Sequence, residues 1–470
     1  MPVSATYRPA PRITSLGDGF FDEVSAATFP KHVLRFRNQR WAARVGLGEL
    51  DDAEWEAHFA RFAPLPGNLP VPLALRYHGH QFDVYNPDLG DGRGFLFAQI
   101  DADDGRLLDL GTKGSGQTPW SRGGDGKLTL KGGVREVLAT EMLEALGVYT
   151  SKTFSLFETG EALMRGDEPS PTRSSVLVRL GHSHLRFGSF QRLAYLKDTA
   201  RLDTLLSYGI ARYTPDIEPG PRRVTDFLAE VTRKSAALAA SWMVAGFVHG
   251  VLNSDNMNVT GESFDYGPYR FLPTYDPDFT AAYFDHQGLY SYGRQPVAVM
   301  RNLVRLAGAL KPLAPHLDVS SALDGFESTL HDETTKRVLA RLGLSSRNDS
   351  ASDEALVAAV YDFLSSSAVG YDRFFFDLYA GRAREAHALA GPASPHYKGA
   401  QWDALRALIQ PYEPVRATIP AYFDRAEPCT LVIGEVERVW DAIAKQDDWS
   451  LFHEKVEEIR EIPRDGGIRF

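Results

Sequence analysis

Oxygen-bearing side chains are concentrated in one short stretch of the chain, residues 249–267. Asp255 and Asn256 are neighbours there, and Asp265 follows nine residues after Asn256. Carboxylate and amide oxygens are the ligands that Mg²⁺ prefers in proteins. The stretch therefore predicts a magnesium site, and a loop rich in Asp and Asn without a ligand is the alternative interpretation.

The spacing within this stretch resembles the metal-binding motifs of protein kinases. Asn256 lies seven residues after His249, as in the pattern H-R-D-x-x-x-x-N, and the D-Y-G sequence at 265–267 resembles D-F-G. The position of the kinase base, two residues after the histidine, holds Val251, which cannot accept a proton. The metal ligands of a kinase are thus matched, whereas the base is not.

A second pair of residues points to the same chemistry. Lys113 ends an apolar run, and Glu136 follows 23 residues later in a segment with helical periodicity. A strand lysine held by a helix glutamate is how kinase-type enzymes aim an ammonium group at nucleotide phosphates. The alternative is a solvated lysine at a strand end, but burying an unpaired ammonium group would be costly.

Two further groups of residues could bind phosphate. The first is Gly90-Asp91-Gly92-Arg93-Gly94, where glycines would let backbone N–H groups approach an anion and Arg93 would add a planar cation; a turn with a surface arginine is the alternative. The second is Arg179, inside an apolar run, with Arg186 seven residues later. Two guanidinium groups that converge on one pocket would suit a polyphosphate.

Several common enzyme classes are excluded by their missing motifs. The chain has no phosphate loop of the form G-x-x-x-x-G-K-[ST], no G-x-G-x-x-G dinucleotide motif, no G-x-S-x-G nucleophile elbow and no H-E-x-x-H zinc motif. His182 and His184 could form a zinc pair, but no carboxylate or cysteine stands at ligand spacing, so hydrogen-bonded or exposed histidines are the favoured interpretation.

The elements that must position these residues follow from hydrophobic periodicity. Apolar runs at 95–100 and 106–110, separated by Asp103-Asp104-Gly105, predict a β-hairpin, and residues 175–180 predict another strand. Helical periodicity follows Gly132-Gly133 and ends near Gly147, and it recurs at 224–248, 298–310 and 355–365. A β-rich part with one helix, followed by a helical part, predicts an α+β fold.

Composition limits the remaining possibilities. The 51 Lys and Arg against 61 Asp and Glu give a net charge of −10, which argues against a general nucleic-acid-binding protein. The single cysteine, Cys429, cannot form an intramolecular disulfide. The sequence contains no apolar stretch of membrane-spanning length and no signal-peptide pattern near its start, so we expect a cytoplasmic protein without a membrane partner.

Longer motifs give a specific resemblance. The segments at 111–119 (G-T-K-G-S-G-Q-T-P), 132–136 (G-G-V-R-E), 183–187 (S-H-L-R-F), 249–257 (H-G-V-L-N-S-D-N-M) and 265–268 (D-Y-G-P), with Arg179, resemble the selenoprotein O family, the YdiU-type group of protein adenylyltransferases. The similarity continues through 275–279 and 290–296 and covers roughly residues 15–312.

The resemblance implies a fold, an activity and a set of residues. It implies a two-lobe fold like that of protein kinases, in which ATP binds in a flipped orientation and AMP is transferred to a Ser, Thr or Tyr hydroxyl of a protein, including the enzyme itself. Asp255 would be the proton acceptor, and Asn256 and Asp265 would hold Mg²⁺. The residues implied to contact the nucleotide are Gly90, Gly92, Arg93, Lys113, Asp125, Gly126, Arg179, Arg186 and Asp265, with Glu136 orienting Lys113.

The expected organisation is an N-terminal flanking segment (1–90), a kinase-like N-lobe (91–190), a C-lobe with the catalytic and metal loops (191–312) and a helical C-terminal extension (313–470). We expect a monomer that uses ATP with Mg²⁺, or with Mn²⁺, which takes the same oxygen ligands. Many members of the family carry a redox-active Cys or selenocysteine near the C-terminus; residues 466–470 (G-G-I-R-F) lack one, so disulfide control is not expected.

Two competing functions remain open from the sequence. One is a protein kinase that transfers the γ-phosphate by means of a relocated base. The other is a non-catalytic pseudokinase that binds ATP and acts as an interaction module. The joint presence of Lys113, Glu136, Asn256 and Asp265 argues against the second, since ATP binding alone would not require all four.

Overall fold

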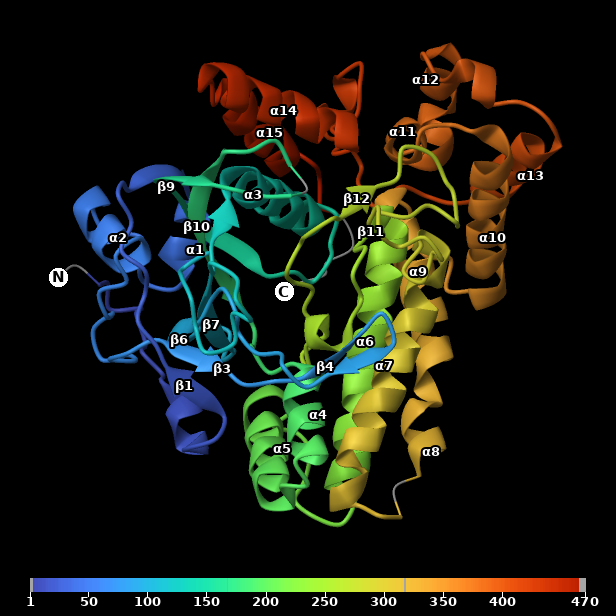
Figure 1. The fold of residues 1–470 in the computed structure, drawn as a ribbon. Coiled ribbons are helices and arrows are strands. Elements are labelled where there is room, and N and C mark those ends of the chain that lie inside the picture. Colours follow the sequence, from blue (N-terminus) through green and yellow to red (C-terminus); the bar gives the residue numbers. More distant parts are fainter. Residues whose placement is uncertain (1–2, 167, 317, 465–470) are drawn as a thin grey trace.

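The computed structural model describes residues 3–166, 168–316 and 318–464 and has an α+β fold, as predicted (Figure 1). One antiparallel sheet of eight strands, in the order β1-β3-β6-β7-β10-β9-β2 with β8 paired to β10, lies on one side of the described molecule. The strands are β1 (Phe21–Glu23), β2 (Val33–Arg37), β3 (Leu73–Leu75), β4 (Gly79–Gln81), β5 (Val84–Asn86), β6 (Leu96–Asp101), β7 (Leu107–Lys113), β8 (Leu128–Thr129), β9 (Lys152–Leu163), β10 (Thr172–Gly181), β11 (Phe247–Val248) and β12 (Arg270–Phe271).

Helices make up most of the other side (Figure 1). They are α1 (Gln39–Arg44), α2 (Asp52–Phe59), α3 (Leu130–Ala145), α4 (Phe187–Tyr195), α5 (Thr199–Tyr213), α6 (Arg223–Ala245), α7 (Gln295–Leu310), α8 (Val319–Leu323), α9 (Gly325–Arg341), α10 (Ser350–Ser367), α11 (Tyr371–Asp377), α12 (Glu385–Ala390), α13 (Ala400–Ile409), α14 (Ile433–Gln446) and α15 (Ser450–Arg460). Among the described residues, none of these helices has the length and apolar character needed to cross a membrane.

The predicted hairpin and strand of the sheet are confirmed. β6 and β7 pair antiparallel around a turn in which Gly105 has a φ of 82°, a conformation that glycine adopts without strain. The strand predicted at 175–180 lies within β10, which pairs with both β7 and β9. The first ninety residues also join this sheet, since β1 pairs with β3 at one edge and β2 pairs with β9 at the other.

Helix α3 begins earlier than its periodicity predicts. The Thr129 hydroxyl accepts a hydrogen bond from the Gly132 backbone N–H and caps the helix, so both glycines lie inside it. A Cβ atom at Gly133 would lie 2.5 Å from Leu156 Cδ1, and the missing side chain therefore lets α3 pack closely on β9. Gly147, with a φ of 75°, follows the helix as predicted.

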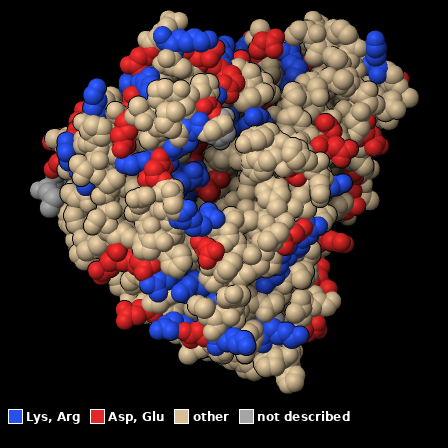
Figure 2. All heavy atoms as spheres, in the orientation of Figure 1, with Lys and Arg blue, Asp and Glu red and all other residues tan. Residues whose placement is uncertain are grey.

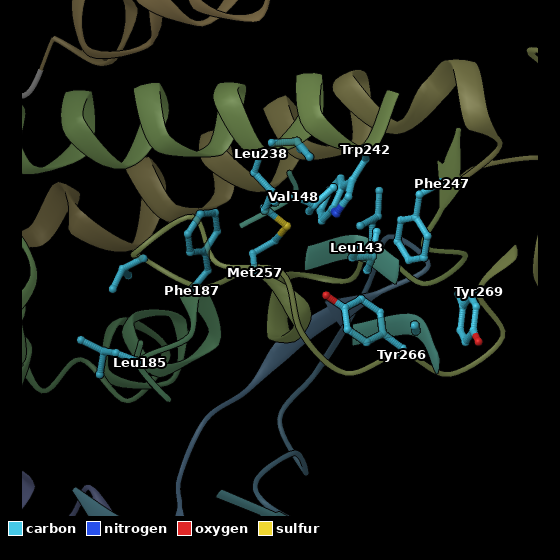
Figure 3. Close-up of a cluster of buried hydrophobic side chains, with 14 of the residues drawn as sticks. Leu143, Val148, Leu185, Phe187, Leu238, Trp242, Phe247, Met257, Tyr266 and Tyr269 are labelled. Atoms are coloured by element: carbon cyan, nitrogen blue, oxygen red, sulfur yellow. The ribbon is translucent and has the colours of Figure 1, made fainter. Parts of the chain in front are cut away.

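The helix predicted at 224–248 is present, but it ends three residues earlier than predicted. Helix α6 stops at Ala245, and Gly246 caps it in a left-handed conformation with a φ of 65°. The next two residues, Phe247 and Val248, pair with β12 instead. Figure 3 shows Trp242 of α6 and Phe247 within one buried apolar cluster that also contains Leu143 and Tyr266, so the residues after α6 continue the core in extended form.

After the helices α7–α13, the last two helices of the chain contact α3. The helices predicted at 298–310 and 355–365 lie within α7 and α10. Helices α14 and α15 then lie beside α3 (Figure 1). An ion pair between Lys131 of α3 and Glu437 of α14, 2.7 Å apart, belongs to this contact.

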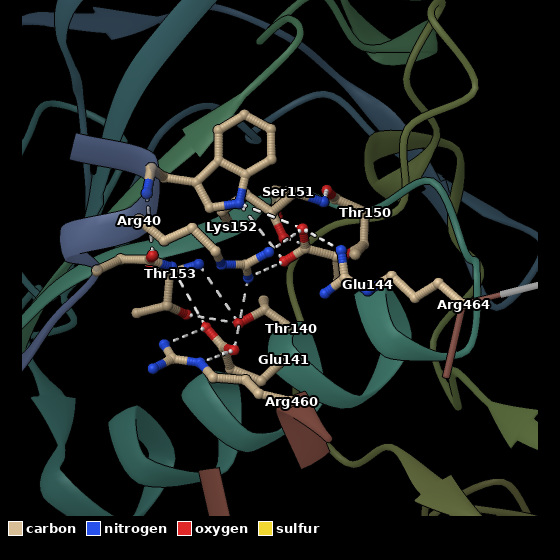
Figure 4. A network of polar contacts seen from close by, with 12 residues as sticks. Arg40, Thr140, Glu141, Glu144, Thr150, Ser151, Lys152, Thr153, Arg460 and Arg464 are labelled. Carbon is tan, nitrogen blue, oxygen red and sulfur yellow. Dashed lines mark hydrogen bonds and ion pairs between the residues drawn. The ribbon is translucent and has the colours of Figure 1, made fainter. Parts of the chain in front are cut away.

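Charged residues join α15 and the segment after it to α3 (Figure 4). Arg460 donates to both carboxylate oxygens of Glu141, at 2.9 and 3.2 Å, and Arg464 lies 3.4 Å from Glu144. Arg40 from α1 binds Glu144 with two hydrogen bonds of 2.9 and 2.6 Å. Both glutamates are buried, so these arginines offset the cost of two desolvated carboxylates.

Replacing Arg460 by Ala should destabilise the protein by about 1–3 kcal/mol, because Glu141 would lose its closest cation while remaining buried. The free energy of unfolding in urea measures the effect. Arg438→Ala is the matched control: Arg438 pairs with Glu435 at the surface of α14, where such a pair contributes about 0–1 kcal/mol. Equal losses for the two variants would contradict the anchoring role of Arg460.

Candidate functional site

Four predicted residues form one ionic cluster between the sheet and the loop after α6. Lys113, the last residue of β7, lies 2.5 Å from Glu136 Oε2 on α3 and 2.7 Å from Asp265 Oδ1. Arg179 of β10 lies 3.5 Å from the carboxylates of both Glu136 and Asp265. Lys113 is buried, so the solvated-lysine interpretation is wrong, and its strand–helix pair with Glu136 is present.

The cluster determines the charge of Asp265. Burial raises the pKa of its carboxyl, but the cations Lys113, Arg179, Arg93 and Arg186 outweigh burial and hold the pKa well below its usual value. Asp265 also has a φ of 64°, which a non-glycine residue adopts only where the surrounding structure holds it. An ionised carboxylate is therefore fixed at this point of the loop.

Arg186 lies at the start of α4 and connects the nucleotide-site candidates to Asp255. Its Nη1 donates to the Asp255 backbone carbonyl at 2.9 Å, and its Nη2 donates to Asp91 Oδ1 at 3.3 Å. The guanidinium lies over the rings of Tyr77 and Phe264, 4.4 and 4.9 Å from their centroids. Arg179 lies 5.4 Å from the same Phe264 ring, so this aromatic residue lies near both arginines.

Asp255 lies in a short 3₁₀ turn, Ser254–Asn256, that follows β11. Its Oδ1 is buried and makes no hydrogen bond with the described residues. Burial raises the pKa of the Asp255 carboxyl to about 6, against the opposing effect of the Arg186 guanidinium. A carboxylate with a free oxygen and a pKa near neutrality has the properties of a general base.

The rate should therefore depend on the protonation of Asp255. A base must be ionised to accept a proton, so we expect kcat/KM to rise with pH through about 6 and to level off above it. The residual rate of Asp255→Asn should lack this rise. The check is a pH profile of both proteins at constant ionic strength and metal concentration, and a rise that persists unchanged in the variant would assign it to another group.

His249 holds the two loops of the site together. Its Nε2–H donates to the Phe264 carbonyl at 3.1 Å, next to Asp265, and its backbone N–H donates to Gln295 Oε1 at 3.0 Å. Both hydrogen bonds are buried. The histidine therefore has a structural connection to the loop that carries Asp265, whereas Val251, two residues later, offers no proton acceptor.

Asn256 and Asp265 suit a divalent cation. The Asn256 side-chain N–H donates to the Val251 carbonyl at 3.0 Å, and its amide oxygen accepts no hydrogen bond from the described residues. Together with the ionised Asp265 it offers two hard oxygen ligands. The described residues contain no group of three or more His, Cys, Asp or Glu side chains arranged for a metal, so phosphate oxygens and water would complete the coordination of Mg²⁺.

The loop that contains Gly90 and Gly92 packs on a second loop, which contains Trp120 and Ser121. A Cβ atom at Gly90 would lie 2.4 Å from the Trp120 ring, and one at Gly92 would lie 2.6 Å from the Trp120 carbonyl. Ser121 Oγ also donates to the Gly92 carbonyl at 2.6 Å. Gly90 and Gly92 are thus required for the contact between the loops, and Arg93, next to them, is exposed to solvent.

The second loop is closed by Gly126 and Asp125. The Gly116 N–H donates to the Gly126 carbonyl at 3.1 Å, and Gly126 has a φ of 68°. Asp125 is exposed and pairs with Arg165 at 2.8 Å, and no contact of the described structure connects it to the Lys113 cluster. The residues predicted to contact the nucleotide therefore lie in two places: the ionic cluster around Lys113, and the two loops that pack on each other through Gly90, Gly92 and Trp120.

Sequence reasoning did not assign a role to several residues that the structure brings to the site: Tyr77, Asp91, Arg122 and Phe264. Asp91 lies inside the glycine-rich motif and could have been noticed there. Arg122 acts on Asp255 by lowering its pKa, from an exposed position with a φ of 49°. His182 and His184 bind Tyr149 and Asp109, so the prediction of hydrogen-bonded histidines is confirmed.

The comparisons with known proteins cover nearly the whole chain. The family model described as "Protein adenylyltransferase SelO" matches residues 3–460. The chain is 45% identical over 474 residues to "Protein nucleotidyltransferase YdiU" of Synechocystis sp., covering 97% of this chain and 98% of that protein. The protein of the same name from Gloeobacter violaceus is 46% identical, with 97% and 95% covered. The one from Vibrio cholerae is 36% identical over 367 residues, with 78% and 74% covered.

Proposed function

The chain belongs to the SelO family of protein nucleotidyltransferases, and from this membership and the geometry of the site we propose that it transfers AMP from ATP to a Ser, Thr or Tyr hydroxyl of a protein. The single observation that carries the proposal is the grouping of Lys113 and Arg179 around Asp265, together with Arg186, which donates to the backbone carbonyl of the buried Asp255. These three cations can neutralise a diphosphate leaving group, and the carboxylate can accept the proton of the attacking hydroxyl.

These groups account for every bond and proton that changes in the proposed reaction. The acceptor oxygen forms a bond to the α-phosphorus of ATP, and the bond from that phosphorus to the bridging oxygen of the diphosphate breaks. The hydroxyl proton moves to Asp255. Diphosphate leaves with the electrons of the broken bond. A Mg²⁺ ion held by Asn256 and Asp265 would supply further charge neutralisation at the phosphates.

The flipped orientation of ATP is part of the proposal. Arg179 and Arg186 are both buried, which suits the innermost end of the triphosphate, whereas Arg93 and Arg122, which act on the Asp265 and Asp255 carboxyls, are exposed. Figure 2 shows a hollow in this face of the molecule with acidic and basic side chains inside it. The kinase-like two-lobe arrangement is likewise proposed, on the basis of the strand lysine, the helix glutamate and the D-Y-G loop.

A protein kinase is the second candidate, because the Lys113–Glu136 pair is the arrangement that kinases use for ATP. The products separate the two reactions. Transfer of AMP releases diphosphate, whereas transfer of phosphate releases ADP, and a protein that only binds ATP releases neither. Anion-exchange chromatography of the soluble products after incubation with a protein acceptor should show diphosphate formed in proportion to modified protein. ADP in that proportion would establish the kinase reaction instead.

A further inference from the structure

The hairpin formed by β4 and β5 lies directly against the candidate base. A Cβ atom at Gly79 would lie 2.8 Å from Asp255 Oδ1, so glycine is needed for this approach. The His80 N–H donates to Ser254 Oγ at 2.8 Å, and the Phe82 N–H donates to Asn253 Oδ1 at 3.2 Å. In Figure 1 the hairpin crosses in front of α6 and α7. It therefore forms one wall beside the reacting carboxylate.

The tip of the hairpin is fastened to α7. Asp83 lies 2.9 Å from Arg301 and also pairs with Arg305. The Phe82 ring packs on Tyr290, with centroids 5.0 Å apart, and the Tyr290 hydroxyl donates to Asn253 Oδ1 at 2.9 Å. These contacts hold the tip at a defined distance from Asp255, and they neutralise the negative charge of Asp83.

Large apolar side chains are exposed around this tip. Val84 in the hairpin is 70% exposed, and Tyr283 in the loop before α7 is 76% exposed. Phe284 is 43% exposed and packs on Phe82, with centroids 5.7 Å apart. Val297 and Val304 are also exposed, and they lie four residues before and three residues after Arg301, on the same face of α7. We call these five residues the hairpin patch: Val84, Tyr283, Phe284, Val297 and Val304.

We propose that the hairpin patch binds the acceptor protein, by taking up an apolar side chain that flanks the modified hydroxyl. This inference rests on the proposed function, because only a macromolecular acceptor would extend from Asp255 onto the patch. Contiguous exposed apolar surface marks an interaction site in proteins. Asp83 with Arg301 and Arg305 carries a net charge of +1, which disfavours a basic segment. The five exposed side chains are apolar, so the patch favours an apolar segment without positive charge, and the hairpin wall places that segment next to the base.

The test uses the full-length protein and synthetic peptides. Each peptide carries one Ser, Thr or Tyr, and one flanking position at a time is either Leu or the uncharged polar Asn. Transfer from ATP labelled at the α-phosphate is measured. We expect Leu at one flanking position to raise kcat/KM by about tenfold or more over Asn, the range for one apolar side chain in a pocket. The double variant Val84→Asn/Tyr283→Asn should lose this preference.

Leu389→Asn is the matched control, because Leu389 in α12 is 44% exposed and remote from the hairpin. It should keep the preference of the parent protein. ATP affinity, measured by titration, reports whether each variant is folded. Label transfer without any preference, or a preference that survives in the double variant, would overturn the docking surface and leave the proposed function in place. No transfer of α-label by the parent protein would overturn the proposed function, and the docking surface with it.

Discussion

Asp255→Asn should keep the affinity of the protein for ATP and Mg²⁺ and lose turnover by about 10²–10⁴-fold, the loss typical of a removed general base. The substitution preserves the shape of a buried side chain whose Oδ1 has no hydrogen-bond partner among the described residues, so the fold should tolerate it. Asp265→Ala should behave differently, because it removes a charged metal ligand next to Lys113 and should weaken metal-dependent nucleotide binding itself.

Metal titration separates these two roles. Excess Mg²⁺ should partly restore Asp265→Ala, since a weakened site can be filled at higher concentration, but it should not restore Asp255→Asn. Normal turnover by Asp255→Asn would show that the base is assigned wrongly. Glu262 would then be the next carboxyl group to test, since burial raises its pKa to about 7.

Lys113→Ala should abolish activity, and Glu136→Gln should reduce it less. Lys113 is the only residue of the cluster within 3 Å of both Glu136 and Asp265 among the described residues, so its removal leaves Arg179, 3.5 Å from each, to compensate two carboxylates. Because Glu136 is buried, we also expect a loss of stability of about 3–5 kcal/mol. Glu136→Gln keeps a hydrogen-bond acceptor for Lys113 and loses only the charge.

Turnover and thermal unfolding should be measured on the same preparations, so that loss of activity can be compared with loss of folded protein. Lys131→Ala is the matched control, because Lys131 lies in the first turn of α3, the helix that carries Glu136, but pairs with Glu437 of α14. It should retain activity. Turnover at the parental rate by Lys113→Ala would remove the lysine–glutamate pair from the mechanism.

Local patterns predicted the parts of the fold that depend on neighbouring residues. The β6–β7 hairpin followed from Asp103-Asp104-Gly105 between two apolar runs, and α3 followed from its apolar period. The end of α6 was predicted three residues too late, because Phe247 and Val248 continue the apolar pattern although Gly246 ends the helix. Periodicity reports which residues are buried, and here burial continues from a helix into a strand.

Contacts between distant segments were not accessible from periodicity. The pairing of Lys113 with Glu136 was predicted only because the motifs resemble those of known enzymes, and the second pair of Lys113, with Asp265, was not predicted. No sequence pattern linked Gly79 to Asp255, or α15 to α3. These contacts join segments that are far apart in the sequence, and local periodicity carries no information about them. The roles of the site residues and the predicted domain boundaries stay predictions for experiment.

Paired labelling of ATP tests the central claim most directly. The protein is incubated with Mg²⁺ and a protein acceptor, once with ATP labelled at the α-phosphate and once with ATP labelled at the γ-phosphate. If AMP is transferred, the acceptor or the enzyme itself should carry α-label and no γ-label, and Asp255→Asn should carry little of either. Protein that carries γ-label without α-label would contradict the adenylyltransferase and establish phosphate transfer in its place.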